Sequence, residues 1–171
     1  MKDLIVYFSH DKENYVNGEI KVLETGNTKI VANKIQEYTK ADLFEIKPLH
    51  DYPYIYSETT TLAKRERNEN IRPKIKNLVS HIEDYQNIYL GFPNWWSTMP
   101  MCVWTFLESY DLKDKNIYPF ITHEGSGFGN SLNDLRKLCP DSIINKGLAI
   151  KGSQVLNSDY KIKQWVKECT L

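Results

Sequence analysis

Short apolar runs alternate with amphipathic stretches along the whole chain. Five runs are short and continuously apolar, as expected for strands that are buried on both faces of a parallel sheet, and they cover residues 4–8, 43–46, 88–92, 117–122 and 148–150. Between them, apolar positions spaced by three and four residues predict helices. These cover residues 28–38, a stretch that begins near Pro73, residues 101–112, residues 132–138 and a last helix that begins at Ser158 or Asp159.

This alternation of strands and helices predicts the fold class. Right-handed βαβ connections place the strands in one parallel sheet and cover both of its faces with helices. We therefore expect an α/β protein with three layers and a doubly wound five-stranded parallel sheet, for which the strand order 2-1-3-4-5 is common. Within the 171 residues we find no repeat, low-complexity tract or linker, so the sequence predicts one domain over residues 1–171.

Two stretches do not fit this regular pattern. Residues 11–24 separate the first strand from the first helix, and Asn17-Gly18 inside them is typical of a tight turn, which predicts a hairpin insert. Residues 49–72 form a long connection that is typical of a functional cover. Its Tyr52, Tyr54 and Tyr56 either line a pocket or cover the core.

Composition excludes several classes of protein. The first apolar run is too short for a signal peptide or a membrane span, so we expect a cytoplasmic protein. The chain has 22 basic and 22 acidic residues and no long run of like charge, which argues against nucleic acid as a partner. Three cysteines without a CxxC pair argue against disulfides and against a metal site.

The first candidate segment follows the first strand and opens the first helix. It contains Ser9 and His10, then the insert, then Gly26, Asn27 and Thr28. A helix N-terminus offers unpaired N–H groups and the positive end of the helix dipole, which together suit a phosphate group. Hydroxyl and amide side chains add donors, and glycine permits close approach of the backbone. The alternative is that Thr28 only caps the helix.

The second candidate segment follows the third strand. It contains two adjacent tryptophans between prolines, and its candidate residues are Pro93, Asn94, Trp95, Trp96, Ser97 and Thr98. Neighbouring side chains in a loop point in different directions, so one tryptophan can pack inward while the other faces a flat ligand. The alternative is that both tryptophans only pack against the core.

The third candidate segment follows the fourth strand and is rich in glycine. Its candidate residues are Thr122, His123, Glu124, Gly125, Ser126 and Gly127. Glycines allow the backbone N–H groups to approach the polar edge of a heteroaromatic ring. His123 either donates to a negative charge that develops on such a ring, or serves a substrate, or only holds its own loop in place. Ligands of open parallel sheets bind at the carboxyl ends of the strands, where all three segments lie.

Taken together, the three segments resemble the flavodoxin-like family. Ser9 with Thr25-Gly26-Asn27-Thr28 is similar to the S/T-x-T-G-N-T phosphate loop of that family. Residues 93–100 are similar to its P-x-W-W-x-T-x-P loop, and residues 122–129 to its T-x-x-G-S-G-x-G loop. The resemblance covers nearly the whole chain in the right order, and only the insert at residues 11–24 departs from it.

The resemblance implies a non-covalently bound FMN. The first segment would bind its phosphate, and the second and third segments would flank its isoalloxazine ring. The insert leaves the role of His10 open and can bring Asn14 or Tyr15 near the ligand. We expect the hairpin to project outward and to close at its base, so that Ser9 and Gly26 are adjacent.

Three functions are compatible with this resemblance. The first is an oxidoreductase that moves electrons or hydride from NAD(P)H or a reductase to a small acceptor such as a quinone. The second is a single-electron carrier between protein partners, and the third is a binding or regulatory module without redox activity. Carrier flavodoxins are typically strongly acidic, whereas this chain is neutral overall, which favours the oxidoreductase. The partners that remain open are NAD(P)H with a small-molecule acceptor, a redox protein, and a second copy in a homodimer.

Overall fold

The computed structural model describes residues 2–169, and its main sheet consists of six parallel strands. From one edge to the other, these are β4 (Asp42–Glu45), β1 (Lys2–Tyr7), β5 (Tyr85–Pro93), β6 (Asn116–His123) and an edge shared by β7 (Ile143–Ile144) and β8 (Leu148–Lys151). Counting β7 and β8 as one broken strand, the order is 2-1-3-4-5. The predicted α/β fold with a doubly wound parallel sheet is therefore confirmed.

The break in the last strand has a local cause. Ile117 of β6 pairs with Ile144, but Phe120 pairs with Leu148, so the edge strand carries one extra residue between the two pairs. Pro119 lies in β6 at this position and has no N–H to donate to a neighbouring strand. The edge strand therefore leaves β6 after Ile144 and pairs with it again from Leu148, with its register shifted by one residue.

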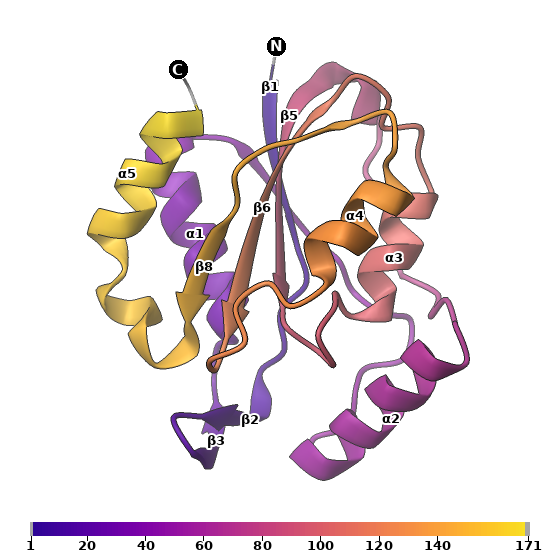
Figure 1. Cartoon of the computed structure of the whole chain (residues 1–171), viewed down its shortest axis with the longest axis vertical. Coiled ribbons are helices and arrows are strands. Elements are labelled where there is room, and N and C mark those ends of the chain that lie inside the picture. Colours follow the sequence, from indigo (N-terminus) through magenta and orange to yellow (C-terminus); the bar gives the residue numbers. More distant parts are fainter. Residues whose placement is uncertain (1, 170–171) are drawn as a thin grey trace.

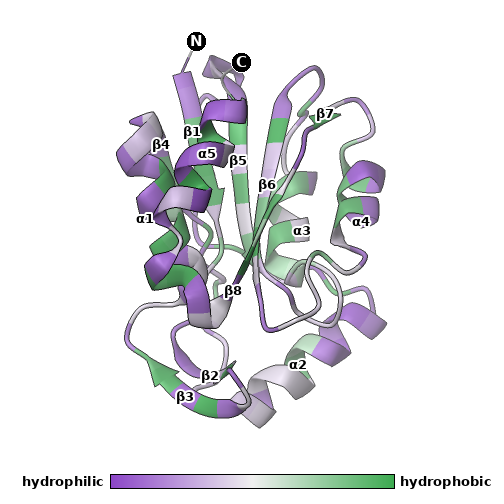
Figure 2. Cartoon of the chain, turned by 60° about the vertical axis from the view of Figure 1, so that its left-hand side comes forward, coloured by the Kyte–Doolittle hydropathy of each residue, from purple (hydrophilic) through white to green (hydrophobic). Residues whose placement is uncertain are grey.

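Helices cover both faces of the sheet (Figure 1). Helices α1 (Asn27–Thr39) and α5 (Asp159–Cys169) pack on the face that buries Ile5 and Tyr7, and α3 (Met101–Glu108) and α4 (Ser131–Leu138) pack on the opposite face. Figure 2 shows hydrophobic segments on the strands between these two helical layers and also on helices such as α1 and α3. None of the helices within residues 2–169 has the length and apolar character needed to cross a membrane.

The insert forms a two-stranded antiparallel hairpin of β2 (Lys12–Val16) and β3 (Glu19–Leu23). Its turn residues Asn17 and Gly18 both have positive φ, as a tight two-residue hairpin turn requires. The hairpin lies beyond the carboxyl ends of the sheet strands, at the same end of the molecule as helix α2 (Tyr56–Asn68) (Figure 1). Two elements outside the main sheet, the hairpin and α2, therefore flank the end of the sheet where a ligand is expected.

The helix predicted to begin near Pro73 is wrong. Residues 72–78 contain no helix, and only a short 3₁₀ turn, Ile82–Asp84, follows them. The second helix is instead α2, which lies inside the stretch predicted to be a long connection. Ile75 and Val79 pack against the core without helical geometry, and Leu78 remains exposed.

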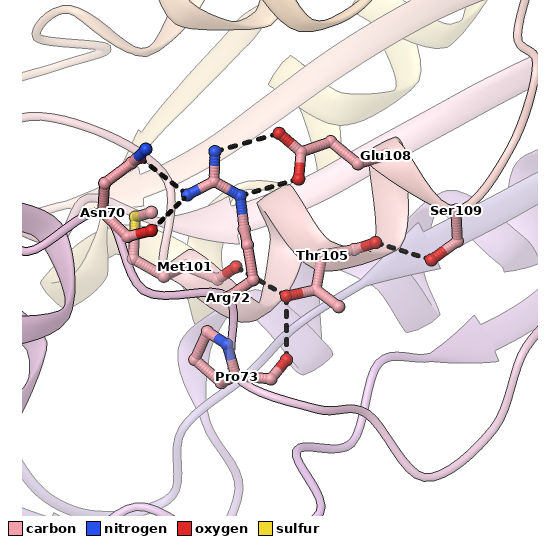
Figure 3. A network of polar contacts seen from close by, with 7 residues as sticks. All are labelled: Asn70, Arg72, Pro73, Met101, Thr105, Glu108 and Ser109. Carbon is pink, nitrogen blue, oxygen red and sulfur yellow. Dashed lines mark hydrogen bonds and ion pairs between the residues drawn. The ribbon is translucent and has the colours of Figure 1, made fainter.

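An anchor to helix α3 explains why the segment after α2 stays extended (Figure 3). The Arg72 guanidinium donates two hydrogen bonds to the Glu108 carboxylate, at 2.7 and 2.9 Å, and it lies over the Trp104 ring. The Thr105 hydroxyl donates to the Pro73 carbonyl oxygen at 2.8 Å. The Lys74 carbonyl oxygen also accepts the Leu49 N–H at 2.7 Å, and the Lys76 N–H donates to the Lys47 carbonyl oxygen at 2.8 Å. Backbone groups of this segment therefore pair with a neighbouring extended segment and not within a helix.

Candidate functional site

A cavity of about 580 Å³ lies at the carboxyl ends of β1, β5 and β6. The three candidate segments form one side of it, and we call residues 26–28, 93–98 and 122–127 the inner loops. The β2–β3 hairpin and helix α2 form the other side, and we call these two elements the outer wall. The cavity therefore lies where an open parallel sheet is expected to bind its ligand.

The first candidate segment contributes His10, Asn27 and Thr28 to the cavity. Asn27 and Thr28 are the first two residues of α1, so they place the positive end of the helix dipole at the cavity. Ser9 lies behind them, where its Oγ accepts the Lys29 N–H at 3.1 Å and caps the helix. The Thr28 Oγ1 lies 2.8 Å from the Thr122 Oγ1, which joins the first and third segments.

Ser9 and Gly26 are adjacent, as the sequence predicts. A Cβ atom at Gly26 would lie 2.2 Å from the Ser9 Oγ and 2.6 Å from the His10 carbonyl oxygen, so only glycine fits this position without a shift. Both residues line a second, smaller cavity of about 280 Å³ rather than the main one. In that cavity the ammonium groups of Lys29 and Lys76 are paired with carboxylates.

The prediction that the hairpin projects outward is wrong, because the hairpin contacts α2 and the third inner loop. Glu13 accepts the Tyr56 N–H on its Oε2 at 2.7 Å, and its own N–H donates to the Tyr54 carbonyl oxygen at 3.3 Å. At the hairpin tip, the Asn17 N–H donates to the Glu124 Oε2 at 3.0 Å. These contacts fold the hairpin back against α2 and the third inner loop, because each satisfies a polar group that would otherwise need water.

The two tryptophans of the second segment point in different directions. The Trp95 ring packs edge-to-face on Phe8, His10 and Tyr52, with centroid distances of 5.3, 5.6 and 4.8 Å. Trp96 is 41% exposed, and its Nε1 donates to the Thr60 carbonyl oxygen of α2 at 2.9 Å. Trp95 thus joins the core to the cavity, and Trp96 joins an inner loop to the outer wall.

The rest of the second segment divides between the cavity and helix α4. Pro93 and Asn94 line the cavity with the tryptophans. The Asn94 side chain accepts the Ser97 N–H at 3.0 Å and donates to the Gly127 carbonyl oxygen at 2.9 Å, so it cross-links the second and third segments. Thr98 donates to Asp134 of α4 at 2.6 Å. Ser97, Thr98 and Gly127 therefore support the cavity from outside its lining.

The third segment lines the cavity with residues 122–126. The Nδ1 atom of His123 accepts the Gly125 N–H at 2.9 Å, so the neutral imidazole carries its proton on Nε2. Burial lowers the pKa of His123 below its usual value, although Glu124 opposes that shift. His123 thus holds its own loop in place and keeps a neutral Nε2–H donor.

Two buried polar atoms that line the cavity have no partner within residues 2–169. These are the Nε2 atom of His10 and the Oε1 atom of Glu124. Burial also lowers the pKa of His10, which keeps its imidazole neutral near pH 7. Because a buried polar atom without a hydrogen bond is costly, both atoms are suited to bind a polar ligand.

Several cavity residues are absent from the sequence-based candidates. They come from the outer wall and from the residue after β8, and they are Glu13, Thr59, Thr60, Ala63 and Gly152. Asn14 and Tyr15, which the sequence places near the ligand only as an open alternative, also line the cavity. Of the three tyrosines in the long connection, Tyr56 lines the cavity, Tyr52 is buried and Tyr54 is exposed. The Asn-Gly turn locates the hairpin in the sequence, but nothing there locates its contact with α2.

Known structures share this arrangement of sheet and helices. A candidate flavoprotein from Bacteroides eggerthii is 28% identical, with a TM-score of 0.79 over 99% of this chain and 98% of its own. A second one, from Bacteroides uniformis, is 26% identical, with a TM-score of 0.74 over 97% of each chain. A flavoprotein from Lactobacillus acidophilus in complex with FMN is 20% identical, with a TM-score of 0.65 over 93% of this chain and 98% of its own.

A comparison with curated proteins gives no match. A family model described as flavodoxin matches residues 21–169. That range includes the first helix, all three inner loops and every strand of the main sheet except β1. The chain therefore belongs to the flavodoxin family.

Proposed function

We propose that this protein binds one FMN without a covalent bond and acts as an oxidoreductase. It passes electrons or hydride from NAD(P)H or a reductase to a small acceptor such as a quinone. The observation that carries this proposal is the cavity itself, because it joins the N-terminus of α1 to the tryptophan and glycine loops and is covered by an outer wall. The family match and the FMN complex of the Lactobacillus acidophilus protein support FMN as the cofactor.

The residues at the cavity fit the chemical groups of FMN. The phosphate carries negative charge, and the first turn of α1 supplies backbone N–H groups, the Asn27 amide and the Thr28 hydroxyl. The unpartnered His10 Nε2 and Glu124 Oε1 suit the phosphate and a ribityl hydroxyl, respectively. No lysine or arginine is among the cavity-lining residues of the described chain, so this binding relies on the helix terminus and neutral donors.

In this mechanism the bound flavin supplies the electron transfer chemistry, and the protein orients and shields it. Asn94 holds together the second and third inner loops, which would flank the ring of a bound FMN. His123 offers an Nε2–H donor that can stabilise negative charge on the ring, and its lowered pKa keeps it neutral. The hairpin and α2 limit the access of water to the cavity, because the hydrogen bond from the Tyr56 N–H to the Glu13 carboxylate holds these two elements together.

A single-electron carrier is the second candidate, since the exposed Trp96 indole lies at the rim of the cavity and can contact a protein partner. The overall charge of zero favours the oxidoreductase, because electrostatic steering toward a redox partner generally needs a strong net charge.

Two measurements on the purified protein test the proposal. First, the protein is expected to be yellow or to quench the fluorescence of added FMN with about 1:1 stoichiometry. A colourless protein that leaves FMN fluorescence unchanged points to a binding module without redox activity. Second, steady NAD(P)H oxidation with a panel of quinones supports the oxidoreductase. The absence of such turnover, together with rapid electron exchange with a flavodoxin reductase, identifies a carrier.

A further inference from the structure

The outer wall presents two tyrosine rings to the cavity. Tyr15 comes from β2 and Tyr56 is the first residue of α2, and their ring centroids lie 6.3 Å apart with an interplanar angle of 30°. The hydrogen bond from the Tyr56 N–H to the Glu13 carboxylate fixes β2 against α2. The two rings therefore form an aromatic surface that the outer wall contributes to the cavity.

The rest of this wall offers few hydrogen-bond donors. The Thr59 hydroxyl donates to the Pro53 carbonyl oxygen at 2.9 Å, and the Thr60 hydroxyl donates to the Ser57 carbonyl oxygen at 3.0 Å. Ala63 adds only a methyl group. Within residues 2–169, neither the Tyr15 nor the Tyr56 hydroxyl has a hydrogen-bond partner, so these two phenols are the donors that remain for a ligand.

Charge at the cavity disfavours a second anion. Among the described residues that line it, the carboxylates of Glu13 and Glu124 are the groups charged at neutral pH, and there is no lysine or arginine. Both histidines have pKa values lowered by burial, so they add no positive charge near pH 7. Two helices begin at the cavity, α1 at Asn27 and α2 at Tyr56. At α2 the Glu13 carboxylate already accepts the Tyr56 N–H, so this helix end has its own anion, whereas the first turn of α1 contains no acidic residue and remains suited to a bound anion.

We propose that Tyr15 and Tyr56 form the acceptor subsite, and that it selects a flat, uncharged aromatic carbonyl compound over an anionic one. The rings of the two tyrosines pack on the acceptor, and their hydroxyls donate to its carbonyl oxygens. This inference rests on the proposed function, which supplies the electrons. A quinone at this subsite gains two electrons and one proton from the reduced cofactor and one proton from water, leaves as the hydroquinone, and returns the cofactor to its oxidised form.

The first test measures binding without turnover, in FMN-loaded protein. The probe is 2-methoxynaphthalene, a flat neutral compound, and its binding is followed by the change in the flavin absorbance band. Tyr15→Leu and Tyr56→Leu are each expected to raise its Kd by about 3- to 10-fold, because an aromatic contact is lost. The Kd for FMN is expected to change less than about twofold. Tyr54→Leu is the matched control, because Tyr54 is a neighbouring tyrosine that does not line the cavity, and it should change neither value.

The second test measures separately the contribution of the Tyr56 hydroxyl and that of the Glu13 charge to acceptor binding. Tyr56→Phe should keep the affinity for 2-methoxynaphthalene but raise the KM for menadione by about 3- to 10-fold, since one hydrogen bond to a carbonyl oxygen is lost. Glu13→Gln keeps an acceptor for the Tyr56 N–H and removes one negative charge. It should reduce the preference for 2-methoxynaphthalene over naphthalene-2-sulfonate by about 3- to 10-fold.

The outcomes distinguish this subsite from the proposed function. Wild-type protein that does not bind FMN refutes both. FMN-loaded protein that reduces ferricyanide, which needs no pocket, but shows unchanged 2-methoxynaphthalene binding in both leucine variants refutes the subsite alone. A parallel loss of FMN affinity in those variants also overturns it, because the tyrosines then hold the cofactor. Equal binding of the neutral and sulfonated probes contradicts the selection by charge.

Discussion

The inner loops and the outer wall enclose the same cavity, but they are held in place in different ways. Two inner loops, residues 93–98 and 122–127, continue from the buried strands β5 and β6, and the first inner loop opens helix α1. Side chains such as Asn94 and Thr28 join the inner loops to one another. The outer wall has no strand in the main sheet; Glu13 joins its two parts, Asn17 and Trp96 link it to the inner loops, and Leu62 of α2 packs against the core. On the proposed function, we therefore expect the inner loops to determine cofactor binding and the outer wall to determine which second ligand enters.

The strongest test of this division is a negative charge at the N-terminus of α1. Thr28 is 1% exposed and touches Thr122, so Thr28→Glu places a carboxylate where the phosphate of FMN is expected. Two negative charges about 4 Å apart repel by about 4 kcal/mol at a protein surface, so we expect the Kd for FMN to rise at least about 100-fold. FMN fluorescence quenching measures it.

Thr28→Ser is the matched control, because it keeps the hydroxyl that faces Thr122, and its FMN affinity should stay within about threefold of wild type. Circular dichroism checks that Thr28→Glu remains folded. If the folded variant retains FMN as well as wild type does, the phosphate assignment is wrong and the inner loops do not have the role given to them.

A smaller effect is expected when the link between two inner loops is removed. Asn94→Ala deletes one accepted and one donated hydrogen bond, and each bond contributes about 1 kcal/mol. We expect the free energy of unfolding to fall by about 2 kcal/mol in urea and the Kd for FMN to rise about 10-fold. A loss of stability without any loss of FMN affinity would show that the two loops do not hold the ring.

The elements around the inner loops can be predicted from the sequence more easily than those of the outer wall. Helix α1 buries Val31, Ala32 and Ile35 at helical spacing, so its apolar face is visible in the sequence. Helix α2 instead buries Thr59 and Glu66 beside an alanine, and polar positions give no such pattern.

In the region after α2, the sequence instead predicts a helix that the structure does not contain. Ile75 and Val79 have the spacing of a helix but pack on the core from an extended segment, because Arg72 and Pro73 are bound to α3. For the site, the loops that directly follow buried strands are predicted from local sequence. The contact between Glu13 and Tyr56 is not, because it joins distant parts of the chain and depends on the tertiary fold.

The outer wall contains a buried carboxyl group whose titration should affect stability. Glu66 is 7% exposed, its Oε2 accepts the Tyr52 hydroxyl at 2.7 Å, and burial raises its pKa above the ordinary 4.5. A carboxyl with a higher pKa in the folded state binds its proton more tightly there, so stability is lost as the pH rises from about 4.5 through the folded pKa. Glu66→Gln, which cannot ionise, should lack this loss.

Urea unfolding between pH 4.5 and 8 measures the effect. We expect the stability of wild type, relative to Glu66→Gln, to fall as the pH rises through this range. Identical slopes for wild type and Glu66→Gln would mean that Glu66 ionises as readily in the folded state as in the unfolded chain.

The smallest expected effect concerns the contact between the two regions. Trp96→Phe removes the hydrogen bond from the indole Nε1 to the Thr60 carbonyl oxygen but keeps an aromatic ring beneath the Lys64 ammonium, which lies 5.0 Å from the ring centroid. Because Trp96 is 41% exposed, water replaces the lost donor, and the free energy of unfolding should fall by only about 0.5–1 kcal/mol.

Hydrogen exchange shows where this loss falls. If the indole attaches α2 to the inner loops, amide exchange should quicken about 2- to 5-fold in α2 and stay unchanged in β1 and β5, because only the outer wall opens more often. Lys64→Met, which removes the cation and keeps the indole hydrogen bond, should leave α2 exchange near the wild-type rate. Faster exchange throughout the sheet in Trp96→Phe would instead mean that the outer wall and the inner loops unfold as one unit, and the distinction between them would not hold.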